Sequence, residues 1–213
     1  MKLYKATLTA NSYLYFYSTE FLKTTTVNNV LHNWALMFAL NEIKADPEKK
    51  HLENLRDINY YCTPAIPREI NKQSFIHNPV PEDTGAGKLG LMRIEKFAPG
   101  SKFQFLVLSK NDKVPPTFIS YGKKKTSHSV NYEELDIIPE YKEKINLKTN
   151  NFINPLDFKK IDSIKYVQKY PLKPSPLYIV EGTFHDVFLL PHFKDTSIFP
   201  QVIPKEFPYS EWI

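Results

Sequence analysis

The chain has 213 residues, of which 42% are hydrophobic and 24% are charged, and its formal net charge is +5. This composition supports one domain with a packed core and excludes a wholly disordered chain. The mild basic excess permits a nucleic-acid partner without requiring one. The single cysteine, Cys62, excludes an internal disulfide framework and an all-cysteine metal site.

Neither membrane insertion nor export is expected. No stretch approaches the ~18 consecutive apolar residues of a transmembrane helix. Lys2 and Lys5 interrupt the first apolar residues before the core of a signal peptide forms. We therefore expect a cytoplasmic protein without a membrane partner.

The first quarter of the chain predicts strands and helices in turn. Residues 2–9 alternate as a half-buried strand does, and the aromatic residues 13–17 favour a second short strand. Apolar residues at helical spacing predict a helix over 27–43, with Thr26 as its N-cap. An Asp-Pro-Glu sequence then predicts a short second helix over 46–55.

Residues 57–90 show no periodicity and contain several prolines. A loop of this length is uncommon in a compact domain and is usually functional, so we predict an inserted arm or thumb. Strand-like runs follow it, separated by proline and glycine. They cover residues 91–98, 102–109, 117–121 and 126–132.

The last third of the chain has weaker signals. A short helix is predicted around 157–167, and a hairpin is predicted from residues 177–190, across Gly182-Thr183. Residues 191–213 are predicted to be an extended tail that packs along the surface. One main helix against an antiparallel sheet is an α+β layout, compatible with a ferredoxin-like core in a single domain.

Neither a nucleotide cofactor nor a metal is expected. Gly85, Gly87 and Gly90 match the dinucleotide glycine pattern, but prolines precede it and a strand-like run follows it. The six histidines show no zinc-helix spacing, and no cysteine pair is available.

The most informative pattern is a basic turn between two strand-like runs. Three adjacent ammonium groups repel one another, so such a run favours an anion, and a nucleic-acid backbone is the natural candidate. Tyr121 is a candidate to stack on a base, and Gly122 lets a backbone approach a phosphate. A solvated hairpin tip is the simpler explanation for the lysines. These lysines are Lys123, Lys124 and Lys125.

The same residues leave a metal-independent endoribonuclease open as an alternative. His128 is then a base near a 2′-hydroxyl, while Tyr121 and Lys125 stabilise the developing charge. Such residues are common around any RNA phosphate site, so the pattern alone does not separate binding from cleavage.

Four stretches together resemble a known family. Their order and spacing are similar to those of the small handle-binding subunit of type I CRISPR Cascade complexes, the Cas-five family. The resemblance is greatest to the type I-D (Csc-one) branch. The stretches are Leu3–Thr9, Leu31–Leu40, Tyr60–Ala65 and Ile119–Lys125.

The resemblance implies a ferredoxin-like, RRM-related domain with a thumb-like insertion. It implies a non-catalytic subunit of an antiviral surveillance complex that binds the 5′ handle of the guide RNA. The backbone subunit and the large subunit are its implied partners, and contact with target DNA near the PAM is left open. In systems like type I-D a separate enzyme processes the guide precursor.

The resemblance also assigns residues by position. Gly122 and the three lysines that follow it would lie along the handle phosphates, with Tyr121 and His128 beside them. The family motif commonly has an arginine before the glycine, where this chain has Tyr121, so stacking would replace a phosphate clamp. The expected contacts of the thumb are Arg68, Lys72 and Lys88.

Overall fold

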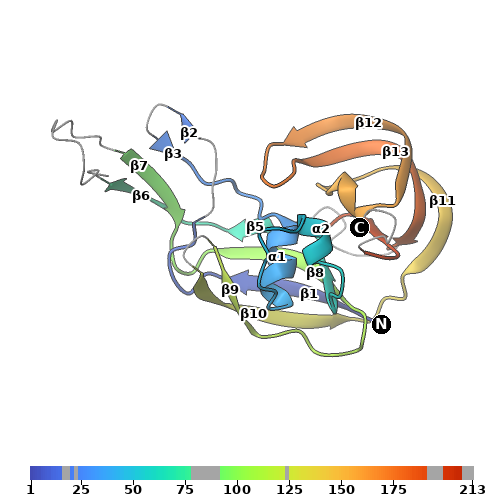
Figure 1. Cartoon of the computed structure of the whole chain (residues 1–213), viewed down its shortest axis with the longest axis horizontal. Helices are drawn as coiled ribbons and strands as arrows, with labels where there is room; N and C mark the ends of the chain where they lie inside the picture. Colours follow the sequence, from blue (N-terminus) through green and yellow to red (C-terminus); the bar gives the residue numbers. More distant parts are fainter. Residues whose placement is uncertain (16–19, 22–23, 78–91, 123–124, 191–198, 208–213) are drawn as a thin grey trace.

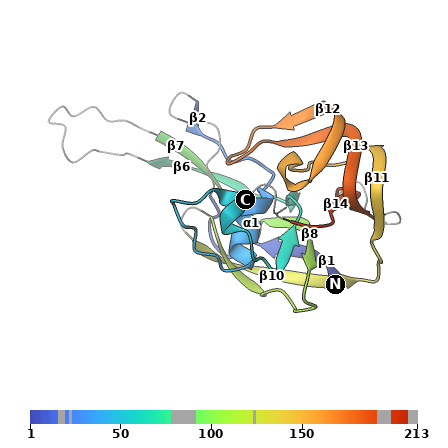
Figure 2. The same cartoon turned by 45° about the vertical axis from the view of Figure 1, so that its right-hand side comes forward.

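The computed structural model describes residues 1–15, 20–21, 24–77, 92–122, 125–190 and 199–207. Figure 1 shows a central sheet with a helix on it, a hairpin that projects from one end, and a second sheet at the other end. Figure 2 shows the same parts from another side. The predicted α+β class, with a mostly antiparallel sheet and one main helix, is confirmed.

Among the described residues, the central sheet has six strands in the order β4-β8-β1-β10-β9, with β5 also paired to β8. All its strand pairs are antiparallel. Strands predicted near β1, β8, β9 and β10 are confirmed with small shifts at their ends. The strands are β1 (Lys2–Thr9), β4 (Tyr60–Cys62), β5 (Ile66–Glu69), β8 (Lys102–Ser109), β9 (Phe118–Tyr121) and β10 (Thr126–Leu135).

The alternation in β1 fixes the buried face of this sheet. Tyr4, Ala6 and Leu8 are buried, whereas Lys5 and Thr7 are partly exposed. Successive side chains of a strand point to opposite faces, so the apolar set is directed to the core. In the predicted second strand, by contrast, the described residues 13–15 make only an isolated bridge, between Leu14 and Phe97.

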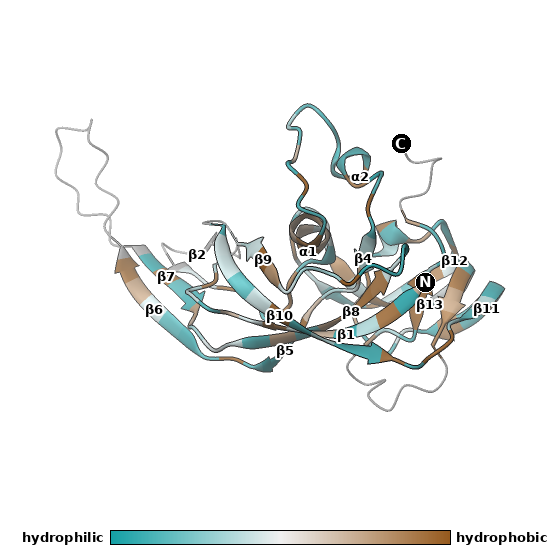
Figure 3. Cartoon of the chain, turned by 90° about the horizontal axis from the view of Figure 1, so that it is seen from below, coloured by the Kyte–Doolittle hydropathy of each residue, from teal (hydrophilic) through white to brown (hydrophobic). Residues whose placement is uncertain are grey.

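Helix α1 (Asn33–Leu40) lies across one face of the central sheet (Figure 3). Its side chains Trp34, Leu36 and Met37 are buried in the main hydrophobic core. The helix lies along the chain between β1 and β4, and its axis is packed over the strands.

The helix is shorter than the predicted span of 27–43 because its approach is extended. The backbone of Leu31 exchanges two hydrogen bonds with Ala65, at 2.8 and 3.0 Å, so it is not available for a helical turn. His32 is therefore the N-cap in place of Thr26, and its Nδ1 accepts a hydrogen bond from the Trp34 N–H at 3.1 Å.

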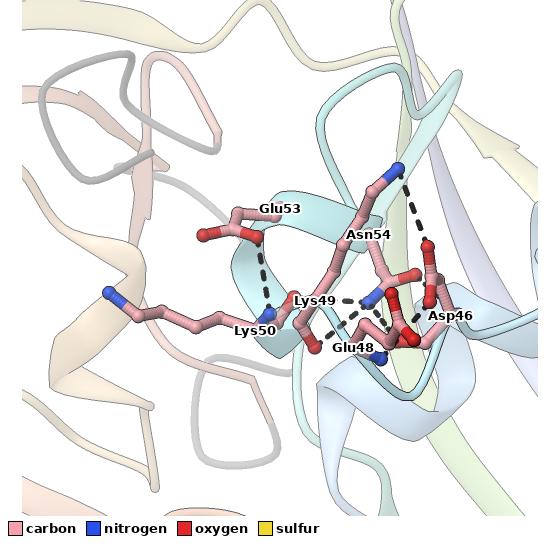
Figure 4. A network of polar contacts seen from close by, with 6 residues as sticks. All are labelled: Asp46, Glu48, Lys49, Lys50, Glu53 and Asn54. Carbon is pink, nitrogen blue, oxygen red and sulfur yellow. Dashed lines mark hydrogen bonds and ion pairs between the residues drawn. The ribbon is translucent and has the colours of Figure 1, made fainter.

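The predicted second helix is reduced to α2 (His51–Asn54). A polar network holds the preceding loop in place (Figure 4). The Asp46 N–H donates to Asn54 Oδ1 at 2.8 Å, and the Glu48 N–H donates to Asp46 Oδ1 at 3.0 Å. Asp46 thus caps a turn in the loop, and the helix begins only after it.

The projecting arm is the hairpin of β6 (Lys72–His77) and β7 (Met92–Phe97). Strand β3 (Thr24–Thr25) adds to β7 in parallel, and β2 (Glu20–Phe21) pairs with β3. The tip, residues 78–91, lies outside the described residues.

The predicted start of the arm, at residue 57, is wrong. Strands β4 and β5 belong to the central sheet, where both pair with β8. They are only three and four residues long and are separated by a Thr-Pro-Ala sequence, so neither shows a readable alternation.

The second sheet contains β11 (Glu140–Lys148), β12 (Lys160–Tyr170), β13 (Leu177–Leu189) and β14 (Val202–Pro204). Strand β13 is central, with β11 and β12 on its two sides, and β14 also pairs with β13. The helix predicted around 157–167 is wrong, because this stretch is mainly β12.

The predicted hairpin across Gly182 is also wrong, because β13 is continuous through it. A Cβ at Gly182 would lie 3.0 Å from Ile161 Cγ2 and 3.1 Å from the Asp162 carbonyl oxygen. This glycine therefore marks a close approach of β12 and not a turn.

Most of the described part of the C-terminal tail is buried and not laid along the surface, although Lys205 and Glu206 are exposed. Phe199, Ile203 and Phe207 belong to the main hydrophobic core, and Val202 belongs to the core under the second sheet. The rest of the predicted tail, 191–198 and 208–213, is outside the described residues.

A buried carboxylate joins the central sheet to the second one. Asp157, at the end of the short helix η1 (Pro155–Asp157), is fully buried. Its Oδ1 accepts from Trp34 Nε1 at 2.7 Å, and its Oδ2 accepts from Asn33 Nδ2 at 2.6 Å and from the Tyr61 hydroxyl at 2.9 Å. We call these four residues the Asp157 cluster.

Candidate nucleic-acid interface

The basic turn connects β9 to β10. Tyr121 and Thr126 face each other at the ends of the two strands, so four residues form the loop. Gly122 has a φ of +90° and Lys125 has a φ of +48°. The Lys125 N–H donates to the Gly122 carbonyl oxygen at 2.9 Å, and the Ser120 hydroxyl donates to the Lys125 carbonyl oxygen at 2.9 Å.

The lysine side chain that the structure describes in this turn is exposed, as a phosphate contact requires. This is Lys125; Lys123 and Lys124 lie outside the described residues. The predicted position of the lysine run, between two paired strands, is confirmed.

Gly122 is needed here for two separate reasons. Its positive φ is unfavourable for other residues. A Cβ would also lie 3.0 Å from Leu14 Cδ1 and 3.3 Å from the Tyr15 carbonyl oxygen. The turn is therefore packed against Leu14 and Tyr15, and Leu14 also pairs with Phe97 at the base of the arm.

Tyr121 does not present its ring to a base. The side chain is 3% exposed and belongs to the main hydrophobic core. Burial raises the pKa of its hydroxyl well above the usual value, so the group stays neutral. The predicted stacking role is wrong, because Tyr121 shares the inward face of β9 with Ile119.

His128 is likewise buried, with no exposed area. Its Nε2 lies 2.8 Å from Thr126 Oγ1 and 3.3 Å from the Tyr121 carbonyl oxygen. Burial lowers the pKa of the imidazole. The predicted role of His128 as an RNA contact or a catalytic base needs an accessible ring, which this arrangement does not offer.

A cavity of about 510 Å³ lies beside the turn. One wall comes from α1 and the loop after it, and the other comes from β9 and the turn itself. Sequence reasoning missed it because its two walls lie far apart along the chain. The lining residues include Ala35, Phe38, Ala39, Ile43, Phe118 and Lys125.

The three residues assigned to the thumb have different places. Arg68 is exposed on β5, in the central sheet, so it is not an arm residue. Lys72 is at the base of the arm, where its Nζ lies 3.2 Å from Glu95 Oε2 and donates to the Val27 carbonyl oxygen at 3.1 Å. Lys88 is outside the described residues.

The arm carries an aromatic and basic cluster that sequence reasoning missed. The Lys96 ammonium lies over the Phe75 ring at 4.9 Å and the Tyr15 ring at 6.0 Å. The Tyr13 ring meets Phe75 edge to face at 5.0 Å, and its hydroxyl donates to Gln73 at 2.6 Å. These residues come from three separate stretches, so only the strand pairing brings them together.

Within the described residues, no group of three or more histidine, cysteine or acidic side chains could hold a metal ion. None of the helices described there is both long and apolar enough to cross a membrane.

The sequence matches the family model of the type I-D CRISPR-associated protein Cas5/Csc1 over residues 1–202. The chain therefore belongs to the type I-D Cas5/Csc1 family of CRISPR-associated proteins, which confirms the resemblance found in the sequence.

Comparison with solved structures gives a distant likeness. One match is a chain of the "Cryo-EM structure of the Type III-B Cmr-beta bound to cognate target RNA and AMPPnP, state 1". It is 11% identical, covers 85% of this chain and 84% of that chain, and has a TM-score of 0.46, too low to support an argument about function. No curated protein matches the chain.

Proposed function

We propose that the chain is a non-catalytic RNA-binding subunit of a type I-D CRISPR effector complex, and that the β9–β10 turn binds the 5′ handle of the guide RNA. Family membership supports a component of such a complex. The observation that carries the binding role is a lysine run on a four-residue turn between paired strands, with Lys125 exposed. Lysine ammonium groups bind phosphates as point charges, which suits a single-stranded RNA backbone.

The proposal includes a ferredoxin-like, RRM-related origin for the central sheet. A ferredoxin-like unit runs β-α-β-β-α-β along the chain. Here β1, α1, β4 and β8 follow the first part of that order. Between β8 and β10 the described residues contain β9 and no helix. The strand order β4-β8-β1-β10 supports this assignment, with β9 in place of the second helix.

Exposed apolar side chains on the second sheet support contacts with partner subunits. Tyr166 is 56% exposed and Val167 is 43% exposed, and the two are consecutive residues of β12. Exposed apolar groups of this kind are common at protein interfaces. The backbone subunit and the large subunit are the proposed partners.

The binding role is tested by changing Lys123, Lys124 and Lys125 together to alanine. We expect stable loading onto guide RNA to be lost at ~150 mM salt, because phosphate contacts carry most of the affinity. The matched control changes three exposed lysines of the second sheet, Lys144, Lys148 and Lys169, to alanine. It therefore has the same net charge as the variant of the turn. Equal loading of both variants and the unchanged chain would contradict the role of the turn.

The endoribonuclease remains the rival proposal, and the burial of His128 weighs against it. The discriminating experiment incubates the purified chain with a repeat RNA in EDTA. We expect no specific cleavage. Cleavage at one position that disappears in His128→Ala would favour the rival.

A further inference from the structure

We propose that the cavity between α1 and β9, here called the α1–β9 cavity, receives one unstacked nucleobase of the RNA that the basic turn binds. The inference rests on the proposed function and adds a base-binding site to it. Single-stranded RNA is generally recognised through bases that leave the stack and enter protein pockets while the backbone follows cationic groups.

The walls of the cavity suit the face of a base. Ala35, Phe38 and Ala39 of α1 form one side, and Ile43 in the following loop extends it. All four are half-buried, so part of their apolar surface faces the cavity and not the core. A volume of about 510 Å³ lies within the range of small-molecule sites, roughly 300–1,000 Å³.

The opposite wall can supply hydrogen bonds to the edge of a base. Five consecutive residues, 118–122, line the cavity. Strand β9 is the outermost strand of the central sheet, and in the described part of the chain its other side has no strand partner. An edge strand presents backbone N–H and carbonyl groups along that side, and these groups are donors and acceptors for hydrogen bonds to a base edge.

Charge at the cavity fixes where the phosphate lies. Lys44 and Lys125 are lining residues with exposed side chains, and Lys125 also belongs to the basic turn. Among the described residues that line the cavity, Glu42 is the one acidic residue. Its carboxylate repels phosphate and accepts hydrogen bonds from base amino groups, so the base enters while its phosphate stays with the lysines.

A peptide strand from a partner protein is the other occupant that an apolar groove beside an edge strand would accept. A nucleotide is favoured because Lys44 and Lys125 line the cavity. An ordinary apolar peptide gains nothing from those charges, whereas a base and its phosphate use both the apolar walls and the cationic rim.

The test fills the cavity without touching the lysines. Ala39→Leu adds apolar volume to the wall, and Ala39→Ser is the matched control of similar size. Both are assayed for binding to a single-stranded repeat RNA of about ten nucleotides, within the 4–16 that such sites cover. A set of RNAs, each with one abasic residue, locates the base that enters the cavity.

We expect one abasic position to weaken binding to the unchanged chain by roughly 5- to 150-fold, the loss of one base contact. Ala39→Leu should weaken binding of the intact RNA to a similar degree and erase the penalty at that position, with the salt dependence unchanged. Ala39→Ser should behave as the unchanged chain does.

A flat abasic scan with salt-dependent binding would overturn the cavity proposal and leave the proposed function standing. No RNA binding by the unchanged chain would refute both. If Ala39→Leu left RNA binding intact but released a partner subunit, the cavity would be a peptide site and the proposal would be wrong. Thermal unfolding of both variants shows whether a loss comes from the fold instead.

Discussion

Two polar regions of this molecule differ in what surrounds them. The β9–β10 turn directs charge outward on the exposed side chain of Lys125. The Asp157 cluster encloses the carboxyl group of Asp157 among three hydrogen-bond donors, and Asp157 is completely buried. The turn is therefore able to bind an external anion, whereas the cluster has its carboxylate satisfied internally.

The contrast separates the residues that we propose to bind RNA from residues that stabilise the fold. His128 and Tyr121 are close to the lysines in sequence, yet they belong with the buried class. Changes in the turn lysines should alter RNA affinity and leave stability intact. Changes in the cluster should alter stability and leave the affinity of the folded fraction intact.

The largest effect on stability is expected for Asp157→Ala. The change leaves three buried donors without an acceptor, and the free energy of unfolding should fall by about 3–5 kcal/mol. Tyr61→Phe removes only one of the three donors and should cost about 1 kcal/mol. Urea denaturation measures both. Loss of RNA binding by Asp157→Ala in a fully folded sample would break the contrast.

Gly122→Ala should cause the next largest loss of stability, because Gly122 has a left-handed backbone conformation and is tightly packed. The positive φ alone costs about 1–2 kcal/mol for alanine, and the crowding against Leu14 adds about 1–3 kcal/mol. Gly100→Ala is the matched control, since Gly100 has a φ of +87° and a Cβ there would meet no atom within 4 Å. Equal losses of stability would show that the turn is not packed against Leu14 and Tyr15.

The pH dependence of stability sharpens the buried side of the contrast. Burial raises the pKa of Asp157 from 3.8 to about 7 in the folded chain, so its contribution to stability is lost as pH rises to 7. Burial lowers the pKa of His32 from 6.5 to about 4, so its contribution is lost as pH falls from 6.5 to 4. The two effects oppose each other between pH 4 and 6.5.

Single variants should expose these two slopes. In Asp157→Asn only the His32 effect is left. The free energy of unfolding should therefore rise more steeply with pH between about 4.5 and 6.5 than it does in the unchanged chain. In His32→Asn only the Asp157 effect is left, so the slope of the free energy of unfolding against pH should be lower than in the unchanged chain. Denaturation midpoints across this range measure both. Slopes that change in the same direction in the two variants would refute these assignments.

The smallest effect is expected for Lys72→Ala at the base of the arm. Its ion pair with Glu95 is partly exposed, so the loss should be about 1 kcal/mol or less. Because Lys72 is engaged with Glu95 and Val27, RNA affinity should change far less than in the turn variant. A loss of RNA binding as large as that of the triple lysine variant would place the arm on the binding side of the contrast.

Local pattern was sufficient to predict β1, β8, β9, β10 and the basic turn, but not β4 and β5 of the same sheet. From Tyr4 to Thr9 the side chains of β1 alternate between buried and partly exposed, and only Leu3 breaks the pattern. Gly122 with its lysines marks a turn by chemistry alone. In β9 the buried Ile119 and Tyr121 alternate with Phe118 and Ser120, but Phe118 is apolar and exposed, so the sequence alone did not show which face is buried.

The second sheet and the cavity were not predictable in this way. Residues 165–169 of β12 are exposed on both faces, so that strand lacks an apolar period. The α1–β9 cavity and the aromatic and basic cluster around Lys96 depend on contacts between distant parts of the chain. Their residues become neighbours only through the sheet order.

The most direct measurement is the salt dependence of RNA affinity for the unchanged chain and for the variant with Lys123, Lys124 and Lys125 all changed to alanine. Each phosphate contact on single-stranded RNA contributes about 0.7 to the slope of log affinity against log salt. The account predicts that the variant's slope is smaller by about 2, with its stability unchanged. The same slope and affinity in both proteins would contradict the claim that the β9–β10 turn holds the RNA.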